Sequence, residues 1–257
     1  MKSYTEQLSD EELNRYRRQI ILKEIGVEGQ LRLAKSKVII IGAGGLGSPI
    51  TLYLAAAGVG KLGIVDHDTV NLSNLQRQIL YSSKNIGQHK AVLAKKRLRG
   101  LNPEIGVLTN TEQVSAKNVK EIISGYDLVI NAVDNIETRY IVNEACIFLK
   151  LPLIEGAIYH FEGYVMTIIP GLSACYRCLF PDNHEAKKEE IGVIGAVPGV
   201  IGTLQAMEAI KYLLNFGRLL KNSMIYYNGL EAKFREIKTQ RNPNCIVCSK
   251  VKYDERK

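Results

Sequence analysis

The chain lacks the features of membrane, secreted and repeat proteins. None of its 257 residues form the run of roughly 18 apolar residues that a transmembrane helix needs. Its first ten residues, Met1–Asp10, are polar and lack the apolar core of a secretory signal. Internal repeats and low-complexity tracts are also absent. We therefore expect a cytoplasmic protein that does not associate with a membrane.

Cysteine is scarce, with five residues in the whole chain. In a cytoplasmic protein these are expected to be thiols or metal ligands rather than disulfides. Four of them form two C-x-x-C pairs, Cys175/Cys178 and Cys245/Cys248, a spacing that suits a closed, structural, tetrahedral zinc site. Two redox-active dithiols are the alternative. Cys146 lies in an apolar segment and is predicted to be a buried core thiol.

The composition indicates one large folded domain with a basic surface. Hydrophobic residues make up 46% of the chain, which excludes a disordered protein, and the length suffices for a substantial core. The formal net charge of +8 reflects basic helix faces and a basic tail. It also favours an anionic partner such as a nucleotide, a nucleic acid or an acidic protein.

The first 155 residues alternate between short apolar runs and helical patterns, which predicts a Rossmann-like α/β fold with a doubly wound, mostly parallel sheet. A capping box at Ser9 and Glu12 starts a helix that should run to about Glu24, and a short helix follows. The remaining elements are expected as strands over 37–41, 62–65, 105–108, 127–131 and 153–154, and as helices over 28–34, 45–57, 90–101, 116–123 and 137–148.

After residue 155 the pattern changes to longer, partly alternating strands over 158–169 and 223–237, with an apolar helix over 199–215 between them. We expect an antiparallel C-terminal extension of the sheet. The charged segment 181–190 has no periodicity and is expected to be a mobile loop. The chain is thus predicted to be a single domain, 1–257, made of N-terminal helices (1–35), a nucleotide-binding half (36–155) and an antiparallel half with the zinc site (156–250).

A glycine-rich turn predicts nucleotide binding. The turn follows a strand and opens a helix, so its backbone N–H groups can approach a phosphate at the helix N-terminus. Its glycines are Gly42, Gly44, Gly45 and Gly47. About twenty residues later, Asp66 ends the second strand and suits the hydroxyl groups of a ribose. These two features alone would also suit NAD or FAD.

Polar residues beyond the turn favour a triphosphate. Asn74 and Arg77 follow Asp66, and Lys90 opens the next helix, so one crossover supplies amide donors and two cations for phosphates. Asp134 follows the strand over 127–131, at the carboxyl edge where ligands of such sheets bind. An aspartate there can hold Mg²⁺ together with a triphosphate. Arg18 is a further basic residue, which the sequence alone would read as a solvated side chain.

Together these motifs resemble the ThiF/MoeB/HesA family, the bacterial relatives of ubiquitin-activating enzymes. The resemblance extends from Arg15-Tyr-Arg-Arg18-Gln19 to Cys248. Its distinctive parts are Asp66-His-Asp68-Thr-Val, Asn71-Leu-Ser-Asn74-Leu-Gln-Arg77-Gln78, Cys175-Tyr-Arg-Cys178-Leu-Phe and Gly202-Thr-Leu-Gln-Ala-Met-Glu-Ala-Ile-Lys211.

The resemblance implies a reaction. Enzymes of this family use ATP and Mg²⁺ to adenylate the C-terminal glycine carboxylate of a small ubiquitin-fold sulfur-carrier protein ending in Gly-Gly, and they release pyrophosphate. The carboxylate nucleophile is already ionised, so the reaction needs alignment and charge neutralisation more than a base.

The resemblance also assigns roles to residues of this chain. Asp66 would hold the ribose, and Asn74, Arg77 and Lys90 the phosphates. Asp134 would organise the metal. Arg18 would reach into the neighbouring subunit's site, which implies a homodimer. The C-terminal half would bind the carrier.

One segment departs from the family pattern. Several members have a cysteine in the loop after the first zinc pair and use it for covalent sulfur transfer. Here the segment 185–192 has none, and Lys188 stands near that position. A covalent thioester or persulfide in this loop is excluded, and we expect no C-terminal rhodanese domain. The prediction is adenylation alone, with a separate persulfide donor supplying the sulfur.

Three other functions remain open. A tRNA-modifying dehydratase of the same superfamily would activate a carboxylate on RNA, but the segment Asn71–Arg77 resembles the sulfur-carrier branch better, so a nucleic-acid partner is not expected. An NAD-dependent oxidoreductase is compatible with Asp66 but leaves the basic clamp and the zinc pairs without a purpose. A non-catalytic binding module is disfavoured because Arg18, Arg77, Lys90 and Asp134 are all present.

Overall fold

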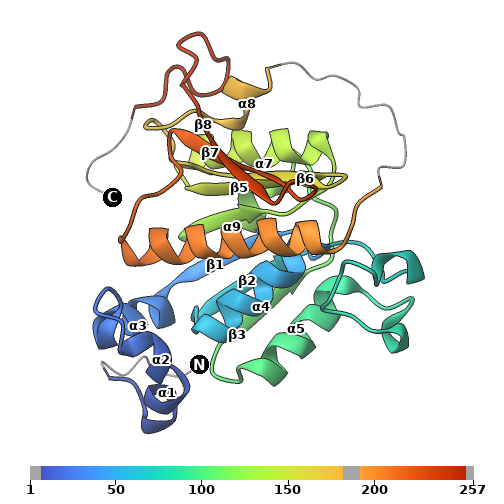
Figure 1. Ribbon diagram of the computed structural model, residues 1–257, viewed down its shortest axis with the longest axis vertical. Helices are drawn as coiled ribbons and strands as arrows, with labels where there is room; N and C mark the ends of the chain where they lie inside the picture. Colours follow the sequence, from blue (N-terminus) through green and yellow to red (C-terminus); the bar gives the residue numbers. More distant parts are fainter. Residues whose placement is uncertain (1–6, 182–191, 253–257) are drawn as a thin grey trace.

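One eight-stranded sheet runs through the molecule (Figure 1), in the order β3-β2-β1-β4-β5-β6-β7-β8. The computed structural model describes residues 7–181 and 192–252. Strands β1 to β5 pair in parallel, and β5 to β8 pair antiparallel. The predicted fold class, a mostly parallel sheet with an antiparallel extension, is confirmed. The parallel strands are β1 (Lys37–Ile41), β2 (Lys61–Val65), β3 (Gly106–Asn110), β4 (Leu128–Asn131) and β5 (Leu153–Tyr159).

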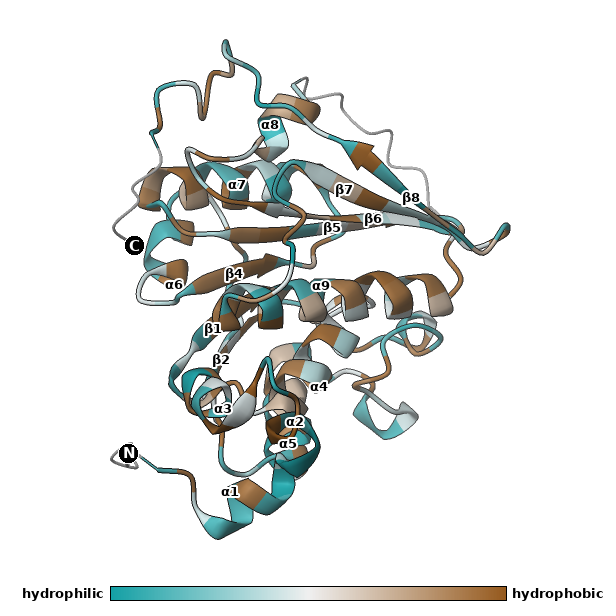
Figure 2. Ribbon diagram, turned by 60° about the vertical axis from the view of Figure 1, so that its left-hand side comes forward, coloured by the Kyte–Doolittle hydropathy of each residue, from teal (hydrophilic) through white to brown (hydrophobic). Residues whose placement is uncertain are grey.

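Helices cover both faces of the parallel strands. Alternate residues of β1 belong to different cores: Val38 and Ile40 pack with one set of helices, and Ile39 and Ile41 pack with the other. This two-sided burial explains why β1, β2 and β4 read as apolar runs in sequence, and β4 is coloured mainly hydrophobic in Figure 2. The first set comprises α3 (Gly26–Lys35), α4 (Gly47–Ala57), α5 (Lys90–Leu101) and α9 (Ala196–Leu214), and the second α6 (Val119–Ile123), α7 (Ile136–Leu149) and α8 (Tyr176–Leu179).

The strand order places a crevice between β1 and β4. The chain adds β2 and β3 on one side of β1 and then returns to add β4 and β5 on the other side. The connections leaving β1 and β4 therefore diverge to opposite sides of the sheet. In open α/β sheets this is the position where ligands bind, outside the carboxyl ends of the strands.

The N-terminal segment differs from the single helix predicted up to Glu24. The capping box is confirmed, since Ser9 Oγ accepts a hydrogen bond from Glu12 N at 3.2 Å and Glu12 Oε2 accepts one from Ser9 N at 2.8 Å. The helix breaks at Tyr16, which separates α1 (Asp10–Arg15) from α2 (Arg17–Ile20). Tyr16 is buried, and its hydroxyl accepts a hydrogen bond from Asn102 Nδ2 at 2.7 Å. Burial of this side chain outweighs continuation of the helix, which the local sequence pattern could not show.

The antiparallel half contains three strands, β6 (Glu162–Ile168), β7 (Ser223–Asn228) and β8 (Lys233–Lys238). The prediction of one long strand over 223–237 is wrong, because the chain turns after Asn228 and forms two strands. The Oδ1 atom of Asn228 accepts hydrogen bonds from the backbone N–H groups of Leu230 and Glu231 within this turn. A second turn, with His160 at φ 52°, separates β5 from β6 inside the strand predicted over 158–169.

The predicted boundary at residue 155 and the predicted loop over 181–190 have different outcomes. The boundary placed at residue 155 falls inside β5, which pairs in parallel with β4 and antiparallel with β6. The charged loop predicted over 181–190 lies outside the described residues, apart from Pro181. Within 7–181 and 192–252, no helix has both the length and the hydrophobicity that a membrane crossing requires.

Candidate functional site

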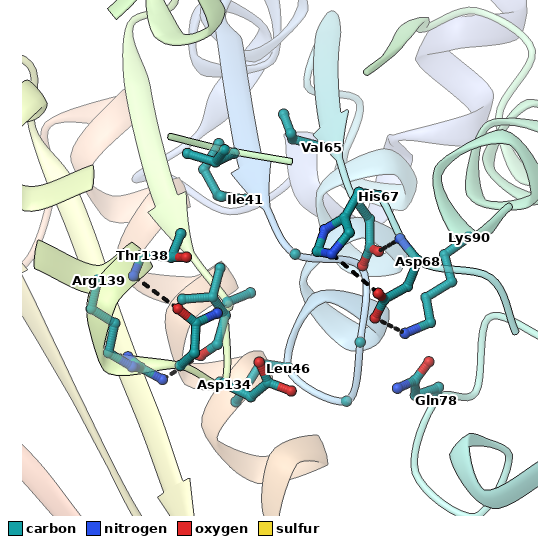
Figure 3. A pocket seen from close by; sticks show the side chains of 18 of the residues that line it. Ile41, Leu46, Val65, His67, Asp68, Gln78, Lys90, Asp134, Thr138 and Arg139 are labelled. Carbon is teal, nitrogen blue, oxygen red and sulfur yellow. Dashed lines mark hydrogen bonds and ion pairs between the residues drawn. The ribbon is translucent and has the colours of Figure 1, made fainter. Parts of the chain in front are cut away.

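A cavity of about 360 Å³ opens at the carboxyl ends of β1, β2 and β4 (Figure 3). Residues from the glycine turn, from the segment after β2 and from the segment after β4 line it. It therefore occupies the crevice that the strand order creates. The lining includes seven of the residues predicted from sequence to bind nucleotide or metal: Gly42, Gly44, Gly45, Asp66, Arg77, Lys90 and Asp134.

The glycine turn fits between the ends of β1 and β4 only because side chains are absent. Gly42 has a φ of +99°, and a Cβ atom on it would lie 2.7 Å from the carbonyl oxygen of Ala132. A Cβ atom on Gly47 would lie 2.1 Å from the carbonyl oxygen of Gly42. Gly47 is not part of the lining, so its position serves the close packing of the turn.

Asp66 closes the turn from the side of β2. Its Oδ2 accepts a hydrogen bond from Ala43 N at 2.8 Å, and its Oδ1 accepts one from Asp68 N at 2.9 Å. Burial raises the pKa of the Asp66 carboxyl, and the Ala43 N–H opposes that rise. The carboxylate is thus fixed beside the cavity by two backbone donors.

The cation of Lys90 is held in the cavity wall by an ion pair. Its Nζ lies 2.8 Å from Asp68 Oδ2, and the Lys90 side chain is 6% exposed whereas that of Asp68 is 52% exposed. His67 Nε2 lies 3.4 Å from the other oxygen of Asp68. Arg77 lines the same cavity and donates from Nη1 to the carbonyl oxygen of Ser73 at 3.0 Å. Two cations therefore border a space large enough for a ligand.

Asp134 and Arg139 lie on the opposite side of the cavity from Asp68 and Lys90 (Figure 3). Asp134 lies in the loop after β4, three residues beyond the last residue of the strand, and is exposed. The next residue, Asn135, caps α7 through a hydrogen bond that its Oδ1 accepts from Thr138 N at 2.8 Å. The cap fixes where α7 begins and therefore where the Asp134 loop ends.

Besides Gly47, two predicted residues of the nucleotide site lie outside the lining of the cavity. Asn74 ends the single turn η1 (Leu72–Asn74), where its Oδ1 accepts a hydrogen bond from Asn71 N at 3.2 Å. Arg18 is exposed on α2. The roles given to these two side chains by the family resemblance remain predictions.

Several lining residues received no role from the sequence, although the first three stand in the family motifs: His67, Asp68, Gln78, Glu112, Gln113 and Arg139. Glu112 and Gln113 follow the carboxyl end of β3, so the rule that selected Asp134 would have found them. Asp68 stands two residues after Asp66 in the motif. Arg139 had no local signal, because it lies inside a helix that reads as amphipathic.

The four paired cysteines converge at the other end of the molecule. The Sγ–Sγ distances are 3.8 Å for Cys175–Cys178, 3.7 Å for Cys175–Cys245 and 3.4 Å for Cys178–Cys248. Tetrahedral zinc with Zn–S bonds of about 2.3 Å places sulfurs roughly 3.8 Å apart, so the donor set fits zinc. Burial raises the pKa of the Cys178 thiol to about 11, so a metal would displace thiol protons on binding. Cys146 is fully buried, as predicted, and burial raises the pKa of its thiol.

Comparison with known proteins identifies the family. Residues 16–247 match the ThiF family. The chain belongs to the ThiF family. A sulfur carrier protein adenylyltransferase of Thermus thermophilus is 46% identical over 247 residues, which cover 93% of this chain and 91% of that protein. A SAMP-activating enzyme E1 of Haloferax volcanii is 44% identical, with 92% of this chain and 89% of that protein covered.

Longer relatives and solved structures agree with this assignment. The adenylyltransferase and sulfurtransferase MOCS3 of Culex quinquefasciatus is 42% identical, and the match covers 96% of this chain but 58% of MOCS3. The crystal structure of E. coli MccB with ATP superposes with a TM-score of 0.83 at 26% identity, covering 91% of this chain and 74% of MccB. The predicted family and the predicted adenylyltransferase activity are confirmed, and ATP is the expected co-substrate of this ThiF-family enzyme.

Proposed function

We propose that this enzyme adenylates the C-terminal glycine of a ubiquitin-fold sulfur-carrier protein. A carboxylate oxygen of the carrier attacks the α-phosphorus of ATP, the bond between that phosphorus and the bridging α–β oxygen breaks, and pyrophosphate leaves. The product is a carrier acyl-adenylate. The names of the Thermus and Haloferax relatives support this substrate class.

One observation supports the proposal most: cations and carboxylates face one another across a single cavity beside a glycine turn. Lys90 borders one side and Asp134 borders the other, and Arg77 is a further cation in the lining. A triphosphate needs positive charge along its length and an acidic residue for its metal. The cavity offers both within about 360 Å³.

Each residue has a defined task in this proposal. Asp66, held by the N–H groups of Ala43 and Asp68, accepts from ribose hydroxyls. Lys90 exchanges its pairing with Asp68 for a phosphate oxygen, a move helped by the exposure of Asp68 to water. Arg77 neutralises the charge that develops on the leaving pyrophosphate.

Two metals fit the residues present. Asp134, at the end of β4, would hold Mg²⁺ together with phosphate oxygens, and the ion would supply Lewis-acid neutralisation of the phosphates. The four cysteines would hold zinc, whose closed coordination gives it a structural task. That zinc would join the segment after β6 to the C-terminal segment that holds Cys245 and Cys248.

Sulfur transfer is assigned to another protein. The sequence has no cysteine between Cys178 and Cys245, and Cys146 is buried. We therefore propose that the enzyme presents the acyl-adenylate to a separate persulfide donor. A homodimer, with Arg18 completing the neighbour's site, is part of the same proposal.

The test is pyrophosphate–ATP exchange with purified ubiquitin-fold proteins ending in Gly-Gly. Exchange should appear with an intact carrier and vanish when its last glycine is deleted. Exchange stimulated by RNA instead of a carrier would favour the dehydratase alternative. Absence of exchange with every carrier tested, in folded enzyme that binds ATP, would contradict the proposal.

A further inference from the structure

Arg139 is buried beside the candidate site, yet the proposed reaction gives it no task. Its side chain is 6% exposed and borders the cavity next to the Asp134 loop. Arg139 lies in the first turn of α7, four residues after the capping residue Asn135. Burial of an arginine is costly unless its donors are satisfied, so its partners show what it holds.

The guanidinium group of Arg139 binds two backbone carbonyls, one of which belongs to the cavity wall. Its Nη2 donates to the carbonyl oxygen of Val133, the residue immediately before Asp134. Its Nη1 donates to the carbonyl oxygen of Gly156 at 2.7 Å. One planar group thus ties the loop after β4 to the middle of β5.

The guanidinium group is itself held in place by a buried network. Nη1 also pairs with Glu155, which is fully buried. Asn131 Nδ2 donates to the second oxygen of Glu155 at 2.7 Å, and Gln205 Nε2 of α9 donates to the carbonyl oxygen of Asn131 at 2.8 Å. Burial lowers the pKa of Arg139, and the Glu155 carboxylate more than offsets that effect, whereas burial raises the pKa of Glu155 against the opposing influence of Arg139.

We propose that Arg139 is a positioning residue that fixes Asp134 through the Val133 carbonyl, with Glu155 fixing Arg139. This inference rests on the proposed function, in which Asp134 organises the metal of the nucleotide. Asp134 is exposed, so its placement depends on the backbone that carries it. A carboxylate displaced by about 1 Å from its working position can lose roughly 100-fold in rate.

Lysine should not replace Arg139, although it keeps the charge. A lysine ammonium can pair with Glu155, but it is a point charge without the planar fork that reaches two carbonyls in different directions. Arg139→Lys therefore removes the tie to Val133 while it leaves the buried carboxylate neutralised. This variant therefore separates the positioning of the Asp134 loop from the neutralisation of the Glu155 charge.

The experiment compares Arg139→Lys with Arg32→Lys, a control on α3 that removes an arginine bond to the Leu214 carbonyl (2.7 Å) away from the cavity. In carrier-dependent pyrophosphate exchange, Arg139→Lys should lower kcat by about 10- to 100-fold, leave KM for ATP nearly unchanged and move Mg²⁺ activation to higher concentration. Arg32→Lys should match the wild type in all three measurements. Melting temperatures of both variants identify any loss of folding.

A second readout does not depend on the reaction. Hydrogen–deuterium exchange should be faster at residues 132–135 in Arg139→Lys than in the wild type, because the loop has lost its tie. If wild-type enzyme shows no carrier-dependent exchange, the proposed function fails while this measurement still tests the inference. Unchanged protection of 132–135, or a folded Arg139→Lys enzyme with wild-type kcat and Mg²⁺ dependence, would overturn the inference.

A double-mutant cycle tests the role of Glu155. Glu155→Gln should reduce kcat in the same direction, because Arg139 loses its anchor. The combined Glu155→Gln/Arg139→Lys variant should lose no more than the worse single variant, since both act through one contact. Fully additive losses would mean that Glu155 does not act through Arg139.

Discussion

Replacement of Lys90 by methionine tests the proposed contact between this side chain and the phosphates of ATP, and it should leave the protein folded. The Lys90 stem is buried and methionine fills a similar volume, so apolar packing is largely preserved. The lost ion pair involves Asp68, which is half exposed and can be solvated by water. Such pairs contribute at most about 1 kcal/mol to the free energy of unfolding, so the variant should remain folded.

The effect on the reaction should be much larger than the effect on stability. In the proposed function Lys90 gives a charge-assisted hydrogen bond to a phosphate oxygen, a contact that contributes about 1.5–3 kcal/mol. Its removal should lower kcat/KM for ATP by roughly 10- to 150-fold. The assay is carrier-dependent pyrophosphate exchange at several ATP concentrations.

The control is Lys96→Met on the same helix, where the lysine is exposed and does not line the cavity. This variant should retain the kcat/KM of the wild type and the same melting temperature. A folded Lys90→Met enzyme with wild-type kcat/KM would refute the reasoning, because the cation in the cavity wall would then have no part in binding the phosphates.

Three further predictions follow from the proposed chemistry. Cys178→Ser should lower both zinc content and melting temperature before it affects exchange activity; a variant of unchanged stability, or wild-type protein free of zinc on metal analysis, would contradict a structural zinc site. Hybrid dimers of an Arg18→Ala chain with an Asp134→Asn chain should regain activity, since one of their two sites then has both side chains; no recovery in verified hybrids would place Arg18 outside the neighbour's site. Cys146→Ala should keep adenylation, and intact-mass analysis after incubation with ATP and carrier should find no enzyme–carrier adduct; a reductant-sensitive adduct that disappears in this variant would disprove the assignment of sulfur transfer to another protein.

The parts of the fold that local sequence determines were predictable. The central parallel strands β1, β2 and β4 are buried on both faces, so each reads as an apolar run, and β1 was predicted with its observed bounds, Lys37–Ile41. The glycine turn was also predictable, because its sequence pattern specifies a local backbone conformation. The rule that ligands bind at the carboxyl ends of strands placed Asp134 at the cavity.

The parts that depend on distant contacts were not predictable. The break at Tyr16 depends on Asn102, which lies 86 residues away in sequence. The pairing of Lys90 with Asp68 spans 22 residues, and Arg139 reaches Glu155 across the sheet. Such contacts exist only after the elements have packed. An amphipathic helix pattern cannot show that one of its buried positions holds a charged side chain.

The central claim is that the enzyme forms an acyl-adenylate on the C-terminal glycine of a carrier. Intact-mass analysis of the carrier after incubation with enzyme, ATP and Mg²⁺ tests it most directly. The account predicts a carrier heavier by one AMP moiety less water, absent when the final glycine is deleted and absent with folded Asp134→Asn enzyme. Absence of an AMP adduct on the intact carrier, or an adduct that persists on the truncated carrier, would contradict it, and an adduct that forms equally with Asp134→Asn would remove Asp134 from the reaction.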